Sequence, residues 1–202
     1  MEIIRIKDTG MEYAIKKASE VLRQGGIMAY PTDTVYGLGV IYDNEEALRR
    51  LIELKGRPLT KGLLLITGSV ESLGMIVEEI PSEITDIIRR YWPGPLTIIF
   101  KARDNISEYI TGGSGKVAIR IPGESFALEF VKKTGLIITS TSANPSNKPP
   151  GNDIEDIISY FPKGLDLIID GGRLSGKPST IIEVIDGKIK VLRKGAIAIE
   201  GK

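Results

Sequence analysis

The sequence predicts an α/β fold in which a twisted, mixed sheet is flanked by helices. Short apolar runs typical of buried strands alternate along the chain with amphipathic segments of helical period. Near the C-terminus, two β-rich runs are joined by Asp186-Gly187, a dipeptide typical of a two-residue hairpin. Strands that alternate with helices favour parallel pairing, and a hairpin adds an antiparallel pair, so the sheet should be mixed.

The individual elements follow from local patterns. Apolar residues recur at helical spacing in residues 11–24, and Asn44 is a typical N-cap for a helix that continues to Leu54. The same period predicts helices at residues 70–77, 82–91, 126–133 and 154–160. Apolar or alternating runs predict strands at residues 3–6, 27–30, 63–66, 96–100, 117–121, 136–139, 165–170, 180–185 and 189–192. We expect residues 140–151, rich in Ser, Asn and Pro, to form a loop, and residues 1–202 to form a single domain.

Composition restricts the chemistry available to the protein. The chain has no cysteine and no histidine, which excludes disulfides, thiolate nucleophiles, the Ser-His-Asp arrangement and the commonest zinc ligands. A net charge of +1 argues against tight binding to long nucleic acid but allows a local basic pocket. The N-terminus lacks the apolar region of a signal peptide, and no apolar run is long enough to span a bilayer, so a cytoplasmic location is expected.

Two cations flank a glycine in Lys55-Gly56-Arg57-Pro58, and Lys61 lies four residues beyond Arg57. Positive charges around a turn can hold a polyphosphate, because a guanidinium binds phosphate oxygens bidentately. The alternative is that these cations only complement the dipole at the end of a helix. Spacing alone favours the alternative.

Polar segments follow two predicted strands. Residues 140–146 supply hydroxyl and amide groups after one strand, and residues 31–39 supply Thr32, Asp33 and Thr34 after another. Ligands of open α/β sheets bind at the carboxyl ends of strands, although such residues also form ordinary turns.

Arg120 lies within an otherwise apolar strand and needs an anion. A substrate carboxylate would serve, and so would Asp33 or another carboxylate of the protein.

The segment Gly171-Gly172-Arg173-Leu174-Ser175-Gly176-Lys177 matches the first part of a phosphate-binding P-loop. Pro178 stands where the metal-binding Ser or Thr should be, and a strand is predicted to follow where a helix is needed. We therefore reject a P-loop here.

Taken together, the chain resembles the threonylcarbamoyl-AMP synthase family, the YrdC-like domain, over nearly its whole length. Six sequence motifs of the family occur in order and at consistent spacing. They are Tyr30-Pro31-Thr32-Asp33-Thr34-Val35-Tyr36-Gly37-Leu38-Gly39, Lys55-Gly56-Arg57-Pro58, Trp92-Pro93-Gly94-Pro95-Leu96-Thr97, Val117-Ala118-Ile119-Arg120, Ser140-Thr141-Ser142-Ala143-Asn144 and Ser179-Thr180-Ile181. The resemblance implies a YrdC-like fold with a concave basic cleft. It also implies that L-threonine, bicarbonate and ATP, with Mg²⁺, give threonylcarbamoyl-AMP and pyrophosphate. A separate threonylcarbamoyl-transferase complex would then modify an adenosine of transfer RNA, and weak direct binding of transfer RNA is a further expectation.

The resemblance also assigns the site. The expected ATP-binding residues are Lys55, Arg57, Lys61, Lys116, Ser142, Asn144, Pro150 and Arg193, with Lys55 and Arg57 catalytic. The expected threonine-binding residues are Thr32, Thr34, Arg120, Ser140 and Ser179, and no metal ligand is assigned. Long family members carry a histidine where this chain has Leu63-Leu64-Leu65-Ile66, as short members do, and their additional C-terminal domain is expected to be absent.

Two alternatives stay open. A noncatalytic module could use the same cleft to bind transfer RNA or double-stranded RNA, although the net charge of +1 disfavours it. YrdC-like domains also occur in hydrogenase-maturation carbamoyltransferases, which would use carbamoyl phosphate in place of threonine and bicarbonate.

Overall fold

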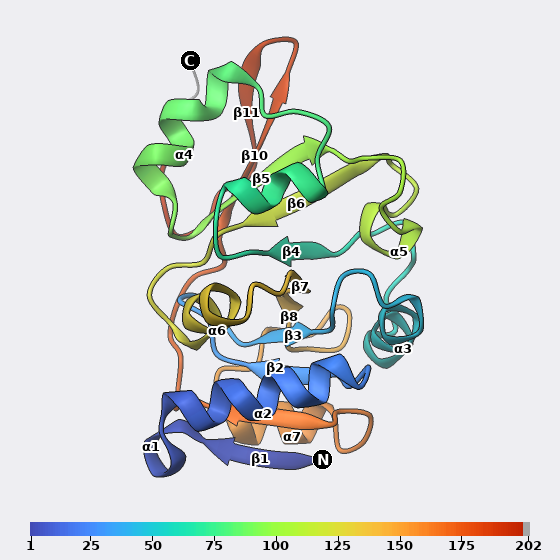
Figure 1. Cartoon of the computed structure of the whole chain (residues 1–202), viewed down its shortest axis with the longest axis vertical. Helices are drawn as coiled ribbons and strands as arrows, with labels where there is room; N and C mark the ends of the chain where they lie inside the picture. Colours follow the sequence, from blue (N-terminus) through green and yellow to red (C-terminus); the bar gives the residue numbers. More distant parts are fainter. Residues whose placement is uncertain (200–202) are drawn as a thin grey trace.

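The computed structural model describes residues 1–199 and contains two mixed sheets, one above the other in Figure 1. The first has the order β1 (Glu2–Arg5), β9 (Leu167–Asp170), β2 (Met28–Tyr30), β3 (Gly37–Gly39) and β8 (Thr141–Ser142). The second has the order β11 (Lys188–Arg193), β10 (Thr180–Ile185), β5 (Leu96–Lys101), β6 (Lys116–Arg120), β4 (Leu64–Ile66) and β7 (Ile138–Thr139). Both combine parallel and antiparallel pairs, which confirms the predicted α/β class.

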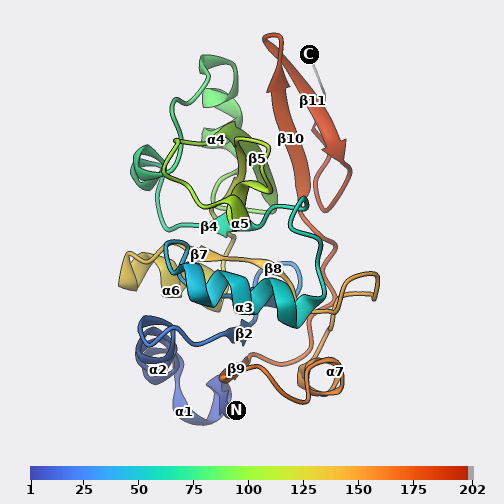
Figure 2. The same cartoon turned by 90° about the vertical axis from the view of Figure 1, so that its right-hand side faces the viewer.

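Helices cover both sheets. They are α1 (Ile6–Thr9), α2 (Met11–Arg23), α3 (Glu45–Lys55), α4 (Thr85–Tyr91), α5 (Glu108–Thr111), α6 (Phe126–Thr134) and α7 (Ile154–Tyr160), with 3₁₀ helices η1 (Glu71–Met75) and η2 (Ser82–Ile84). Figure 2 shows α2 and α7 on opposite sides of the five-stranded sheet. Within residues 1–199, the helices are all too short or too polar to cross a membrane.

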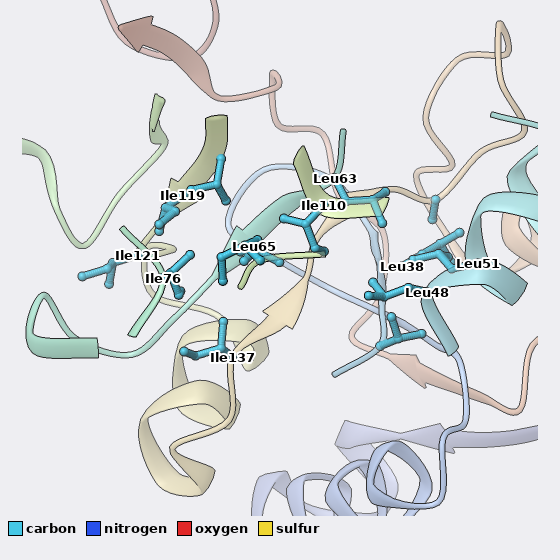
Figure 3. Packing of buried hydrophobic residues seen from close by; sticks show 14 of the residues in the cluster. Leu38, Leu48, Leu51, Leu63, Leu65, Ile76, Ile110, Ile119, Ile121 and Ile137 are labelled. Atoms are coloured by element: carbon cyan, nitrogen blue, oxygen red, sulfur yellow. The ribbon is translucent and has the colours of Figure 1, made fainter. Parts of the chain in front are cut away.

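The larger of two buried apolar clusters among the described residues joins the two sheets. Leu38 of β3 belongs to the same buried cluster as Leu65 of β4 and Ile119 of β6, and Leu48 and Leu51 of α3 pack into it. Figure 3 shows these side chains together. Burial of apolar side chains stabilises the folded state in proportion to the area removed from water, so this shared cluster holds one sheet against the other. The boundary between the sheets is therefore a rigid place for a site.

Several predicted elements are confirmed, and others differ. The helix at residues 154–160 and the strand at residues 180–185 have the predicted bounds, Asn44 caps α3, and Asp186 and Gly187 adopt φ angles of 52° and 70° in the hairpin. The helix predicted at residues 70–77 is only the 3₁₀ helix η1, which contains Gly74, and the segment 82–91 begins as η2 after Pro81. Gly74 disfavours a regular α-helix within residues 70–77.

The sequence did not predict β3, β8, α1 and α5, nor the division of the strands between two sheets. β3 pairs with β2 on one side and with β8 on the other, at Gly37 with Ser142 and Leu38 with Thr141, so β8 forms through a contact distant in sequence. The predicted loop at residues 140–151 accordingly begins with one short strand.

Candidate active site

A cavity of about 320 Å³ lies where the two sheets meet. The chain crosses from β7 to β8 at Ser140, and it crosses again between β9 and β10 through residues 171–179. We call this space the boundary cavity; it is lined by Thr32, Thr34, Val35, Tyr36, Gly37, Arg57, Gly62, Leu64, Ala118, Arg120, Ser140, Thr141, Ser142, Pro150, Pro178, Ser179, Ile181 and Arg193.

The turn between β2 and β3 places two threonines in the boundary cavity. Thr32 Oγ1 accepts from the backbone N–H groups of Thr34 at 3.1 Å and Val35 at 3.2 Å, and it donates to the Val35 carbonyl at 2.7 Å. The hydroxyls of Thr32 and Thr34 are 3.0 Å apart. A threonine that binds its own turn in this way holds the backbone in one conformation. The turn therefore fixes the Thr34 hydroxyl.

Arg120, the last residue of β6, is 5% exposed and is held on three sides. Its Nε donates to the Gly94 carbonyl at 3.0 Å, its Nη1 donates to Thr34 Oγ1 at 3.0 Å, and its Nη2 forms an ion pair with Asp33. Burial lowers the pKa of Arg120, and Asp33 opposes that shift. Of the anions considered from the sequence, the structure places Asp33 on this guanidinium. A guanidinium has five N–H groups, so two stay available after these three contacts.

Arg193 of β11 also lines the boundary cavity. Its Nε and Nη2 donate to the Ser179 carbonyl at 3.1 Å and 2.8 Å, and Nη2 also lies 3.1 Å from Ser179 Oγ. Ser179 Oγ is in turn 2.8 Å from Thr97 Oγ1. Burial, and then the charge of Arg120, lower the pKa of Arg193. This arrangement fixes the side chains of Arg193 and Ser179 in the cavity wall.

Arg57 is the third guanidinium of the boundary cavity. It follows Gly56, which ends α3 in the left-handed conformation, and it donates to the carbonyls of Lys61 at 2.6 Å and Gly62 at 2.7 Å. Burial lowers its pKa. Among the described residues that line the cavity, none is acidic. Three guanidiniums with one carboxylate behind them make the cavity attractive to anions.

Nine of the thirteen predicted site residues line the boundary cavity. On the predicted nucleotide side these are Arg57, Ser142, Pro150 and Arg193; on the predicted threonine side they are Thr32, Thr34, Arg120, Ser140 and Ser179. The roles of these residues stay predictions. Their convergence supports the grouping made from the sequence.

The other four predicted residues lie outside the lining. Lys55 is 3% exposed, and its Nζ donates to the Ser142 carbonyl at 2.5 Å and the Asn144 carbonyl at 2.7 Å. Lys116 Nζ pairs with Glu183 at 2.5 Å, and Lys61 is exposed. Asn144 is 8% exposed, and its Oδ1 is a buried atom without a hydrogen-bond partner. The roles of these four residues also stay predictions. The side-chain amine of Lys55, however, is hydrogen-bonded to carbonyls of the protein's own backbone.

Sequence reasoning missed Tyr36 and the chain segment after β9. The Tyr36 hydroxyl donates to the Gly172 carbonyl at 2.7 Å and accepts from the Gly171 N–H at 3.1 Å, and burial raises its pKa to about 12. A Cβ on Gly176 would lie 2.2 Å from the Thr34 carbonyl oxygen, so only glycine fits there. The segment rejected as a P-loop is thus a wall against the turn at Thr34, and the strand predicted after it is β10. Its glycines were the signal for this close approach.

The comparisons with known proteins agree with this geometry. Residues 20–195 match the Sua5/YciO/YrdC family model, which is described as "Telomere recombination". A protein of Hahella chejuensis named threonylcarbamoyl-AMP synthase is 37% identical over 87% of this chain and 96% of its own length. A protein of the same name from Pyrococcus abyssi is 35% identical over 98% of this chain, which spans 58% of that protein.

A solved structure gives the same result. P. abyssi Sua5 complexed with L-threonine has a TM-score of 0.87 and 34% sequence identity, over 96% of this chain and 57% of that one. The likeness covers both sheets and the boundary cavity between them, because almost the whole chain is matched. The chain belongs to the Sua5/YciO/YrdC family.

Proposed function

We propose that the protein is an L-threonylcarbamoyladenylate synthase, a nucleotidyltransferase that forms threonylcarbamoyl-AMP and pyrophosphate from L-threonine, bicarbonate and ATP. The observation that carries this proposal is the convergence of Arg57, Arg120 and Arg193 on one cavity that also presents threonine and serine hydroxyls. Relatives named for this product, and the threonine complex of P. abyssi Sua5, support it.

The lining of the boundary cavity suits the two organic substrates. The two free N–H groups of Arg120 would bind the threonine carboxylate, with hydroxyls of Thr34 and Ser140 in the same lining. Arg57 and Arg193 would bind phosphate oxygens of ATP. The substrates would thus be held side by side, with the threonine amine between them.

The chemistry then depends on alignment and charge. The threonine amine and bicarbonate give a carbamate and water. A carbamate oxygen attacks the α-phosphorus of ATP, a new P–O bond forms, and the bond to pyrophosphate breaks. Such phosphoryl chemistry is promoted mainly by positioning and by fixed charges that stabilise the transition state. Arg57 would supply that charge, and no histidine is required.

The proposal includes a magnesium ion that accompanies ATP. Among residues 1–199 there is no group of three or more acidic or histidine side chains able to hold a metal ion. Magnesium commonly keeps several waters and binds through substrate phosphates with one or two carboxylates. Magnesium would therefore enter the site bound to the phosphates of ATP. When bound there, it would neutralise charge on the departing pyrophosphate.

The experiment measures pyrophosphate release with each substrate omitted in turn. The proposal predicts release only when ATP, L-threonine and bicarbonate are all present. Arg57→Ala should reduce turnover about 10²–10³-fold, as removal of one transition-state contact does elsewhere. Arg89→Ala is the matched control, because Arg89 is a surface guanidinium of α4 with a side chain 76% exposed, and it should keep wild-type turnover. Near-normal turnover in Arg57→Ala would remove Arg57 from the mechanism.

Two other outcomes would point elsewhere. Turnover with carbamoyl phosphate, but not with threonine and bicarbonate, would assign a carbamoyl-adenylate enzyme. Steeply salt-dependent RNA binding without pyrophosphate release would assign the noncatalytic RNA module. The transferase complex, direct transfer RNA binding and a cytoplasmic location stay predictions.

A further inference from the structure

Lys55 lies at an unusual place for a charged side chain. It is the last residue of α3, it is 3% exposed, and it does not line the boundary cavity. Buried lysines are rare, and their amines need partners. Here both hydrogen-bond partners of the amine are backbone carbonyls of one loop, at Ser142 and Asn144.

A third contact joins the same two segments. The backbone N–H of Ser146 donates to the Lys55 carbonyl at 2.9 Å. The loop after β8, residues 143–151, is therefore attached to the end of α3 through both the side chain and the main chain of Lys55. Figure 2 shows this loop beyond β8, at the end of α3. The loop is also attached to the β2–β3 side through Ala143, whose N–H donates to the Tyr36 carbonyl at 2.8 Å, and it is closed by the Gly151 N–H, which donates to the Ala143 carbonyl at 3.1 Å.

The attached loop carries groups of the predicted nucleotide side. Pro150 within the loop and Ser142, the last residue of β8 just before it, line the boundary cavity. Asn144 lies between them with its buried Oδ1 unpartnered. A displacement of the loop would move these groups together, whereas Arg57, which binds the Lys61 and Gly62 carbonyls, would stay in place.

We propose that Lys55 is a positioning residue that holds the loop of residues 143–151 against α3 and so shapes the nucleotide side of the boundary cavity, without binding phosphate itself. The part about the nucleotide rests on the proposed function; the attachment of the loop does not. A neutral amine still has two N–H groups, one for each carbonyl. The attachment should accordingly persist when the amine loses its proton.

The decisive experiment is hydrogen exchange of the protein without any ligand, followed by mass spectrometry. In Lys55→Met, exchange within residues 143–151 should rise about tenfold or more, as expected when two hydrogen bonds that hold the loop are lost. The rest of the chain should exchange as in the wild type. Lys133→Met is the control for loss of a lysine, since Lys133 is a surface residue of α6 with a side chain 45% exposed. Arg57→Met is the control for loss of a cavity cation, and both should keep the loop protected.

A second variant covers the case in which Lys55→Met fails to fold. Lys55→Gln keeps an N–H donor but is one atom shorter, so it cannot reach both carbonyls, and the loop should again exchange faster. If the loop of either folded variant is as protected as in the wild type, the proposal is wrong. This result does not depend on whether the protein makes threonylcarbamoyl-AMP.

Kinetics separates positioning from direct phosphate binding. For Lys55→Met we expect a KM for ATP raised about tenfold with kcat changed less than about threefold, because the loop is displaced while Arg57 stays. Loss of kcat comparable to that of Arg57→Ala, with a protected loop, would show instead that Lys55 acts on the reacting phosphates.

Discussion

The buried ion pair between Asp33 and Arg120 provides a quantitative test of how Arg120 is held in the boundary cavity. Asp33→Ala removes the carboxylate and leaves the guanidinium in a site where the two side chains are 6% and 12% exposed, for Arg120 and Asp33 respectively. Removal of one partner of a buried pair typically costs about 3–5 kcal/mol of folding free energy, because the remaining charge is uncompensated.

The structure places this variant at the lower end of that range. Arg120 keeps hydrogen bonds to the Gly94 carbonyl and to Thr34 Oγ1, and both acceptors partly compensate its charge. We therefore expect a loss of about 3 kcal/mol. For a chain of 202 residues, this corresponds to a melting temperature lower by about 6–12 °C.

Urea denaturation of three variants tests the reasoning. Asp86→Ala breaks the exposed pair with Arg89, in which Asp86 is 96% and Arg89 is 76% exposed, and should cost less than about 0.5 kcal/mol. The double variant Asp33→Ala with Arg120→Met removes both buried charges and should recover much of the loss seen in Asp33→Ala. If Asp33→Ala is no less stable than Asp86→Ala, Arg120 does not need this carboxylate and the account of the pair is wrong.

Two further predictions concern α3. Asn44→Ala removes the side-chain acceptor for the Ala47 N–H, now at 3.0 Å, and should lower the free energy of unfolding by about 1 kcal/mol in urea denaturation. Asn105→Ala, in an exposed turn, is the comparison. Burial, and then Arg57, lower the pKa of Lys55 from 10.5 to about 7. Between those values the unfolded chain binds more protons than the folded chain, so stability contributed through Lys55 should rise with pH, by at most about 1.4 kcal/mol per pH unit. The difference in unfolding free energy between wild type and Lys55→Met, measured at several pH values from 7 upward, checks this; a flat difference would mean that the amine keeps an ordinary pKa.

Local patterns predicted those parts of the fold that depend on nearby residues. Asn44 as a cap, the Asp186-Gly187 hairpin and α7 are set within a few residues, and each is confirmed. β8 contains only Thr141 and Ser142, and it forms because it meets β3. No period can be read from two residues, so this strand and the division into two sheets could not be predicted.

In the candidate site, too, contacts between residues distant in sequence could not be predicted. The sequence indicated that Arg120 needed an anion, but the choice between a substrate and Asp33 depends on where the β2–β3 turn lies relative to β6. Lys55 and Arg57 look equivalent in sequence, as two cations around Gly56. The left-handed Gly56 sends their side chains apart, so that Arg57 lines the boundary cavity and Lys55 is buried against the loop.

The most direct test of the central claim is the mass of the nucleotide product formed from ATP, L-threonine and ¹³C-labelled bicarbonate. Our account predicts threonylcarbamoyl-AMP that is one mass unit heavier than the product from unlabelled bicarbonate, and its loss in Arg57→Ala. Binding of ATP and threonine by the folded wild-type protein, with no labelled adenylate formed, would contradict the proposed reaction.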